Sequence, residues 1–155
     1  MSETAGLPRR LGLRPETSTT GPHRQLTQRA TPELWARLVL RSVSIEGVCE
    51  GRSSVSLPDS RALLLLGMPS RHDERSLAVS GPIEPVHLRS VADTSVHLCL
   101  PAARAREACE ALRGEPHPYA DYETQLMLYG PRDAAELELI YGLIVESIAF
   151  ARTLD

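Results

Sequence analysis

Two neighbouring segments of the chain, residues 84–89 and 95–100, alternate aliphatic with polar side chains. His87 lies among the polar positions of the first segment and His97 among those of the second. Successive side chains of a strand point to opposite faces, so each segment is predicted to be a strand with one apolar and one polar face. A register slip of one residue would bury histidine against leucine. We therefore predict a β-hairpin in which His87 lies opposite His97.

The rest of the pattern predicts helices and further strands. Thr31 can cap a first helix, a second helix follows Pro101, and Asp133 can cap a long C-terminal helix with an apolar stripe. Further strands are expected over residues 42–50, 53–57, 62–66, 77–79 and 124–129. The sequence thus predicts an α+β fold, an antiparallel sheet of about five strands with helices packed on one face and a long C-terminal helix.

Composition predicts how the chain divides into a tail and a domain, and it argues against several classes of protein. Residues 1–30 are rich in Gly, Pro, Ser, Thr and Arg, and we expect a disordered N-terminal tail followed by a single domain over residues 31–155. A net charge of -3 argues against a nucleic-acid binder. Because the chain has no long apolar run and three cysteines without metal-type spacing, we expect a cytoplasmic protein with no membrane partner. A homodimer, with the tail folded over a neighbouring subunit, stays open.

The polar face of the hairpin carries groups that could do chemistry. His87, Arg89, His97 and Cys99 are predicted to share that face. Outside the hairpin, His117 lies between two prolines, which stiffen the backbone around it. A histidine held firmly in a loop is a functional hint, because a loop does not otherwise require it.

Three blocks of sequence resemble the fungal-luciferase-like domain family. They are VHL followed by VHLCLP in the hairpin, GEPHP at residues 114–118, and LMLYGPRDAAELELI at residues 126–140, running into a helix with IVESIAFA. The resemblance covers roughly residues 84–151 and implies a small α+β domain of a bacterial relative. Family positions that carry over are His87, His97, Glu115, His117, Pro118, Tyr129, Pro131 and Arg132.

The chain departs from the family pattern in two places. The first strand of the hairpin usually reads His-x-His, and Arg89 stands at the second histidine. A Gly-Trp pair usually precedes the GEPHP-like block, and Leu112 and Arg113 stand there. The loss of one histidine weakens a multi-histidine metal site.

The resemblance implies an enzyme of natural-product biosynthesis. The fungal namesake oxidises a hydroxylated pyrone with molecular oxygen and without a cofactor. We expect a cofactor-independent oxygenase, isomerase or cyclase that acts on an enolisable aromatic, pyrone or polyketide-type small molecule. A histidine would act as general base and Arg89 would hold the anion. The expected catalytic residues are His87, His97, His117 and Arg89, and the expected substrate-binding residues are Glu115, Tyr119, Tyr122, Met127, Tyr129 and Cys99.

Two alternatives stay open. One is a metal enzyme in which His87, His97 and His117 hold Fe or Zn. The other is a non-catalytic module that binds a small molecule.

Overall fold

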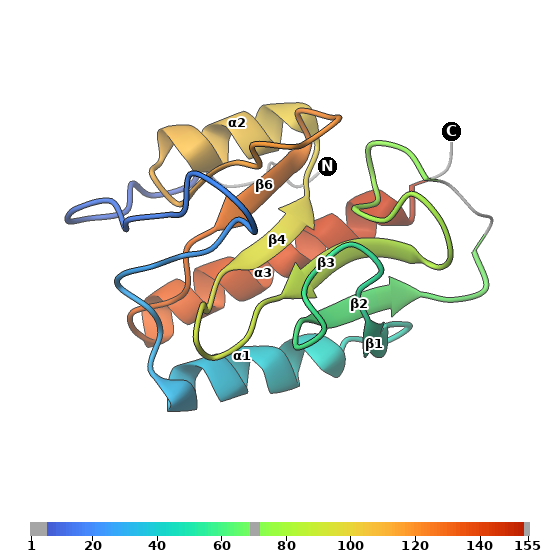
Figure 1. Ribbon diagram of the computed structural model, residues 1–155, viewed down its shortest axis with the longest axis horizontal. Helices are drawn as coiled ribbons and strands as arrows, with labels where there is room; N and C mark the ends of the chain where they lie inside the picture. Colours follow the sequence, from blue (N-terminus) through green and yellow to red (C-terminus); the bar gives the residue numbers. More distant parts are fainter. Residues whose placement is uncertain (1–5, 69–71, 154–155) are drawn as a thin grey trace.

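The computed structural model describes residues 6–68 and 72–153. Within these residues, six strands form one antiparallel sheet in the order β1-β2-β3-β4-β6-β5 (Figure 1). The strands are β1 (Cys49–Arg52), β2 (Arg61–Leu65), β3 (Ile83–Leu88), β4 (Val96–Cys99), β5 (Gly114–Pro116) and β6 (Gln125–Leu128). The predicted α+β class and antiparallel sheet are confirmed.

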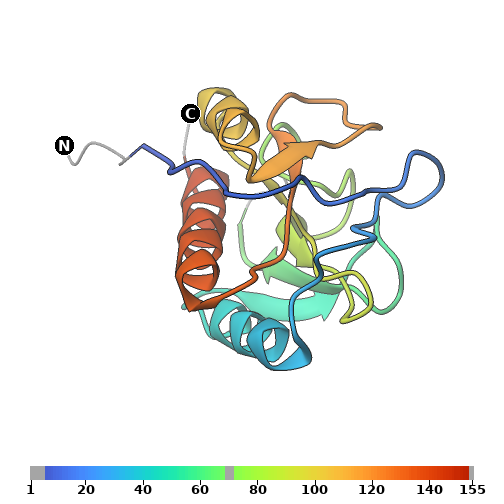
Figure 2. The same cartoon turned by 90° about the vertical axis from the view of Figure 1, so that its left-hand side faces the viewer.

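Helices cover one face of the sheet, as predicted. They are α1 (Pro32–Val43), α2 (Ala102–Glu110) and α3 (Ala134–Ala151). The long C-terminal helix α3 packs against β3 and β4, α1 packs against α3, and α2 lies beside β5 (Figure 2). The expected caps form: Thr31 accepts a hydrogen bond from the N–H of Leu34, and Asp133 accepts one from the N–H of Glu136.

The apolar face of the sheet and the helices enclose an aliphatic core. Val86 and Leu88 of β3, Val96 and Leu98 of β4, and Leu126 and Leu128 of β6 are all at most 1 % exposed. They pack against apolar side chains of the helices, among them Leu38, Leu137, Ile140, Ile144 and Ile148. Burying each large aliphatic side chain stabilises the fold by roughly 1.5–3 kcal/mol.

The hairpin has the predicted register. His87 pairs with His97 across β3 and β4, and Leu88 pairs with Val96. The aliphatic side chains enter the core and the two histidines lie on the opposite face.

Several expected strands are wrong, for local reasons. The segment 42–50 does not form a strand throughout, because α1 continues to Val43 and β1 begins only at Cys49. The segment 53–57 is a loop, since Ser53 Oγ and the N–H of Ser54 donate to the carboxylate of Glu84 instead of joining a ladder. The segment 77–79 is also irregular, and the short strand β5 was not expected.

The N-terminal segment differs from the disordered tail that composition suggested. Residues 1–5 lie outside the described residues, but residues 6–30, here called the arm, pack on the domain without forming a helix or a strand of the sheet. Arg10, His23 and Gln25 of the arm are at most 3 % exposed. Individual hydrogen bonds to the domain take the place of an apolar stripe, so hydrophobic periodicity could not show this packing. The arm begins beside α2 and α3 and then crosses to the side of the sheet away from α3 (Figure 2).

Candidate functional site

The face of the sheet opposite the core carries a row of side chains from five strands. Cross-strand pairing aligns Ala62, His87, His97, Met127 and Glu115 in that order across β2, β3, β4, β6 and β5. Residues aligned in this way have side chains on the same face. The row brings predicted site residues from distant parts of the sequence together on one surface.

Four of the five histidines of the chain gather on this face. The ring of His97 stacks on that of His87 with centroids 4.9 Å apart, and it meets the ring of His117 edge-on at 5.5 Å. The fourth ring, His23, lies 5.6 Å from His97 and 5.3 Å from His117. We call these four residues the histidine cluster. The three histidines singled out in the sequence therefore meet in one place.

Sequence reasoning missed His23, because it lies in the arm. The side chain of Gln25 fixes this part of the arm: its amide oxygen accepts a hydrogen bond from the N–H of Gly130, and its amide nitrogen donates to two arm carbonyls. The backbone N–H of Gln25 donates to Asp93 in the hairpin turn. These contacts hold His23 over the sheet. No periodicity marks it, and the only signal is the scarcity of histidine in the chain.

Glu115 connects the arm to the sheet. Its carboxylate contacts His23 Nε2 at 2.8 Å and accepts hydrogen bonds from Arg14, Thr17 and the hydroxyl of Tyr129. Burial opposes the charged form, but the hydrogen bonds from His23, Arg14 and Tyr129 outweigh it and lower the pKa of Glu115 to about 2. Burial raises the pKa of Tyr129 to about 12. Glu115 is therefore an anion that orients His23, and Tyr129 is a neutral donor to it.

Burial keeps three imidazoles neutral, those of His87 and His97 on the sheet and that of His117 in the loop after β5. His97 is 1 % exposed, and burial, together with the nearby His87 and Arg89, places its pKa well below the ordinary value. Burial also lowers the pKa of His87, although Glu84 opposes the shift. For half-buried His117, burial and His23 lower the pKa to about 4. These rings present lone pairs at neutral pH but are weak bases.

The carboxylate of Glu84 contacts the imidazole of His87. Its Nδ1 lies 2.8 Å from Glu84 Oε2, and Glu84 is 1 % exposed. A carboxylate at this position favours the tautomer with the proton on Nδ1. Nε2 of His87 is then a lone pair, buried and without a hydrogen-bond partner among the described residues.

Arg89 donates hydrogen bonds to two neighbouring side chains. Its Nε donates to Asp93 at 3.1 Å and one terminal nitrogen donates to Ser56. The other terminal nitrogen, Nη2, is buried without a partner in the described part of the chain. The guanidinium is thus paired to a buried carboxylate beside the cluster, and its charge is largely offset.

The remaining predicted substrate-binding residues fall into two groups. Met127 and Cys99 are fully buried, and burial raises the pKa of the Cys99 thiol, which therefore stays protonated. Tyr119 and Tyr122 are 64 % and 42 % exposed in the loop after β5. The ring of Tyr119 lies 6.0 Å from that of His117, so it is at the margin of the cluster.

A hollow of about 640 Å³ opens beside the cluster, between the arm and β5. His23 and Glu115 line it, together with Arg14, whose side chain is 57 % exposed. Other lining residues are Pro15, Glu16, Thr17, Ser18, Thr19, Leu26, Pro116 and Pro118. A hollow of this size accommodates a small organic molecule.

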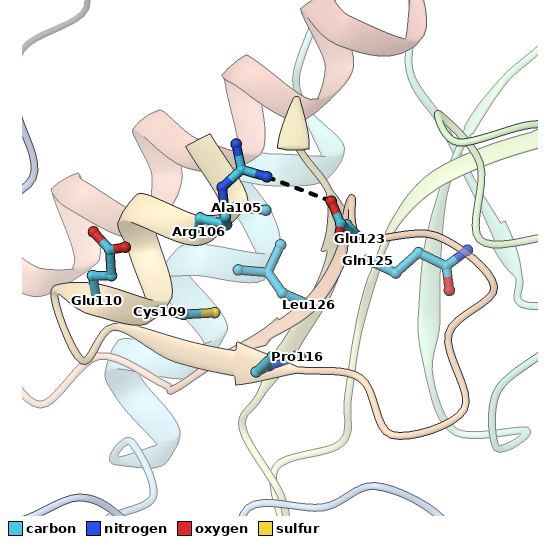
Figure 3. Close-up of a pocket in the computed structure, with 8 residues that line it drawn as sticks. All are labelled: Ala105, Arg106, Cys109, Glu110, Pro116, Glu123, Gln125 and Leu126. Carbon is cyan, nitrogen blue, oxygen red and sulfur yellow. Dashed lines mark hydrogen bonds and ion pairs between the residues drawn. The ribbon is translucent and has the colours of Figure 1, made fainter. Parts of the chain in front are cut away.

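A second hollow, of about 320 Å³, lies between α2 and the β5–β6 edge (Figure 3). Its floor is mostly apolar, from Ala105, Cys109 and Leu126, and an ion pair between Arg106 and Glu123 crosses it. Burial raises the pKa of Cys109. None of the residues that line this hollow belongs to the histidine cluster, so the hollow beside His23 is the candidate site.

The comparisons with known proteins support the family resemblance. Residues 83–147 match the family model described as Luciferase domain. The match begins at β3 and ends within α3, so it includes three members of the cluster but not His23. No curated protein and no solved structure matches the chain. Among the described residues, no helix has both the length and the apolar character needed to cross a membrane.

Proposed function

We propose that this chain is an enzyme that converts a small enolisable molecule at the histidine cluster. The proposal starts from the match of residues 83–147 to the Luciferase domain model. The substrate class is a hydroxypyrone, phenol or polyketide enol, and the reaction is an oxygenation, isomerisation or cyclisation. The observation that supports this best is the gathering of four imidazoles beside a hollow of about 640 Å³.

Folding alone does not account for the cluster. Apolar side chains would fill the same space without the desolvation cost of buried ring nitrogens. Two of these nitrogens, His23 Nδ1 and His87 Nε2, are buried without a hydrogen-bond partner among the described residues. A group that burial makes costly and that no neighbour satisfies is typical of a functional centre.

The proposed chemistry begins with removal of a proton. An acidic O–H or C–H of the substrate gives its proton to a neutral imidazole of the cluster, and the electron pair stays on the enolate oxygen. Arg14 lines the hollow and is well placed to attract the anion, whereas Arg89 does not line it and is paired with Asp93. The enolate then reacts with oxygen, takes the proton back at another carbon, or attacks an electrophilic carbon of the same molecule.

The proposal can be tested by measuring turnover of a panel of three candidate substrates. Purified protein is incubated in air with a hydroxypyrone, a dihydroxynaphthalene and a β-diketone, and oxygen uptake and product mass are followed. We expect conversion of at least one compound, and a loss of about 100-fold or more in His117→Ala, by the usual size of an acid–base contribution.

His72→Ala is the matched control, because His72 contacts the carbonyl oxygen of Gly81 and lies outside the cluster. Its activity should equal that of the unchanged protein. Equal turnover by His117→Ala, or no conversion of any compound by the unchanged protein, would contradict the proposal.

A further inference from the structure

Three histidines of the cluster are arranged as metal ligands are. His23, His97 and His117 each have a ring nitrogen within 4.8 Å of those of the other two. Their rings meet edge-on, with interplanar angles between 70° and 88°, whereas the ring of His87 stacks on His97 at 28°. Edge-on rings can direct nitrogens at a common point, which stacked rings cannot. The set differs from the one expected from sequence, since the arm supplies His23 in place of His87.

An unsatisfied atom gives independent support. His23 is 3 % exposed, and its Nε2 contacts the carboxylate of Glu115. The proton of a neutral ring then lies on Nε2, and Nδ1 carries a lone pair. This Nδ1 is buried and has no hydrogen-bond partner among the described residues. A cation would satisfy it.

His97 is oriented in a comparable way. Ser95 Oγ donates its only proton to Asp93 at 2.6 Å, so toward His97 Nε2, 3.4 Å away, it can act only as an acceptor. The proton of His97 therefore lies on Nε2, and its Nδ1 lone pair stays available. In His117, the lone pair of Nδ1 accepts the N–H of Tyr119 at 3.2 Å. A bound ion would displace this contact, and the N–H of Tyr119, an exposed residue, would then donate a hydrogen bond to water.

Fixed charges of both signs lie around the cluster. Three carboxylates surround the cluster, those of Glu84, Asp93 and Glu115, against two guanidiniums, those of Arg14 and Arg89. Arg89, the cation closest to the sheet histidines, is paired with Asp93 at 3.1 Å. A carboxylate that holds the far nitrogen of a ligating histidine, as Glu115 holds His23, is a common support of metal sites.

We propose that His23, His97 and His117 bind one divalent transition-metal ion, with Zn²⁺ the ion that three imidazoles and an open position suit best. The inference rests on the proposed function in one respect, because the ion would lie in the same reactive centre. There it would attract the substrate oxygen and stabilise the enolate. His87, outside the ligand set, keeps its free Nε2 to accept the proton.

Zinc binding to the full chain, purified without an affinity tag and stripped with chelator, tests the proposal. Calorimetry should give about one Zn²⁺ per chain, and Co²⁺ should produce the visible absorption bands of a four-coordinate site. His23→Ala and His117→Ala should each weaken Zn²⁺ binding by about 100-fold or more, and Glu115→Gln by about 10- to 100-fold. His72→Ala should bind as the unchanged chain does. Far-UV circular dichroism confirms that each variant is folded.

Failure of this inference can be told from failure of the proposed function. No stoichiometric Zn²⁺ binding, or unchanged binding in folded His23→Ala and His117→Ala, overturns the metal site. Turnover by chelator-stripped protein would then leave the enzyme proposal standing on imidazole alone. Stoichiometric binding that depends on His23 and His117, without turnover of any compound, supports the metal site and contradicts the enzyme.

Discussion

Leu112 is a residue whose backbone conformation does not suit its side chain. Its φ of 59° lies in the left-handed region. It follows the end of α2, where the N–H of Arg113 donates to the carbonyl of Ala108 and the N–H of Leu112 donates to that of Cys109. These two hydrogen bonds form a Schellman motif, in which glycine is the usual residue at the position of Leu112.

We predict that Leu112→Gly stabilises the protein. A residue with a Cβ costs about 1–2 kcal/mol in the left-handed region, and the backbone entropy of glycine offsets part of this. A net gain of about 1 kcal/mol raises Tm by roughly 2–4 °C in a domain of this size. Thermal unfolding followed by circular dichroism measures the change.

Leu112→Ala is the control, because it shortens the side chain but keeps the Cβ and the strain. It should have a Tm no higher than that of the unchanged protein. A lower Tm for the glycine variant than for the alanine variant would show that the backbone strain is not significant.

Single residues also show what the sequence could and could not predict about the site. His87 and His97 were placed together because strand alternation and the hairpin register allow one pairing. His117 was singled out by its two flanking prolines, although its distance from the hairpin could not be known. His23 was missed because polar hydrogen bonds of Gln25, rather than an apolar period, fix the arm.

At the scale of elements, the first turn of α3 joins three parts of the chain through Glu136. Its carboxylate accepts hydrogen bonds from the N–H and the guanidinium of Arg132 and from the guanidinium of Arg113. Arg132 in turn donates to the carbonyl of Leu11 in the arm. Asp133 caps the helix as the sequence predicted. Arg132, one of the family positions, thus has a structural role here.

We predict that Glu136→Gln destabilises the protein in a pH-dependent way. Burial opposes ionisation, but the hydrogen bonds and charge of Arg132 outweigh it, so the pKa of Glu136 lies below its ordinary 4.5. The unfolded chain therefore binds the proton more tightly. The stabilisation is fully present above about pH 4.5 and is lost as the pH falls through the folded pKa. At pH 7 the substitution should cost about 1–3 kcal/mol, as measured by urea unfolding.

The difference between Glu136→Gln and the unchanged protein should shrink as the pH is lowered from 7 toward 3. Glu138→Gln is the control, since the Glu138 side chain is 62 % exposed on the same helix. Surface ion pairs of this kind contribute about 0–1 kcal/mol. A cost for Glu136→Gln that does not vary with pH would mean that its charge is not responsible.

Helices and strands were predicted correctly where one of their faces packs against the core. The hairpin, β6, α1, α2 and α3 carry apolar residues at a regular period, β2 lies in a continuous apolar run, and all were expected. The segments 53–57 and 77–79 alternate over only a few residues, and polar contacts decide their conformation instead. Ser53 and Ser54 bind Glu84, which in turn orients His87. The loop that was mistaken for a strand therefore supports the candidate site.

At the scale of the whole molecule, the sheet separates two kinds of packing. One face carries the aliphatic core and the helices, and the other carries a polar row covered by the arm. Among the described residues, Ala30 is the one buried core residue that the arm supplies, whereas the arm supplies the fourth ring of the cluster and a wall of the hollow. Stability and site geometry should therefore depend on the arm to different extents.

Gln25→Ala tests this separation. The side chain is buried and makes three hydrogen bonds, to the N–H of Gly130 and to the carbonyls of Thr27 and Gln28. Its loss leaves these groups unsatisfied, and we expect a decrease in the free energy of unfolding of about 1–3 kcal/mol. The arm loosens before the core does, so Zn²⁺ affinity should fall at temperatures where far-UV circular dichroism still reports the folded sheet.

Thr20→Ala is the matched control in the arm, because Thr20 is exposed, lies five residues before Gln25 and does not line the hollow. It should keep the stability and the Zn²⁺ affinity of the unchanged protein within experimental error. If Gln25→Ala lost Zn²⁺ binding only together with the circular dichroism signal of the sheet, arm and core would form one cooperative unit. The arm would then be an integral layer of the fold rather than a separately anchored wall of the site.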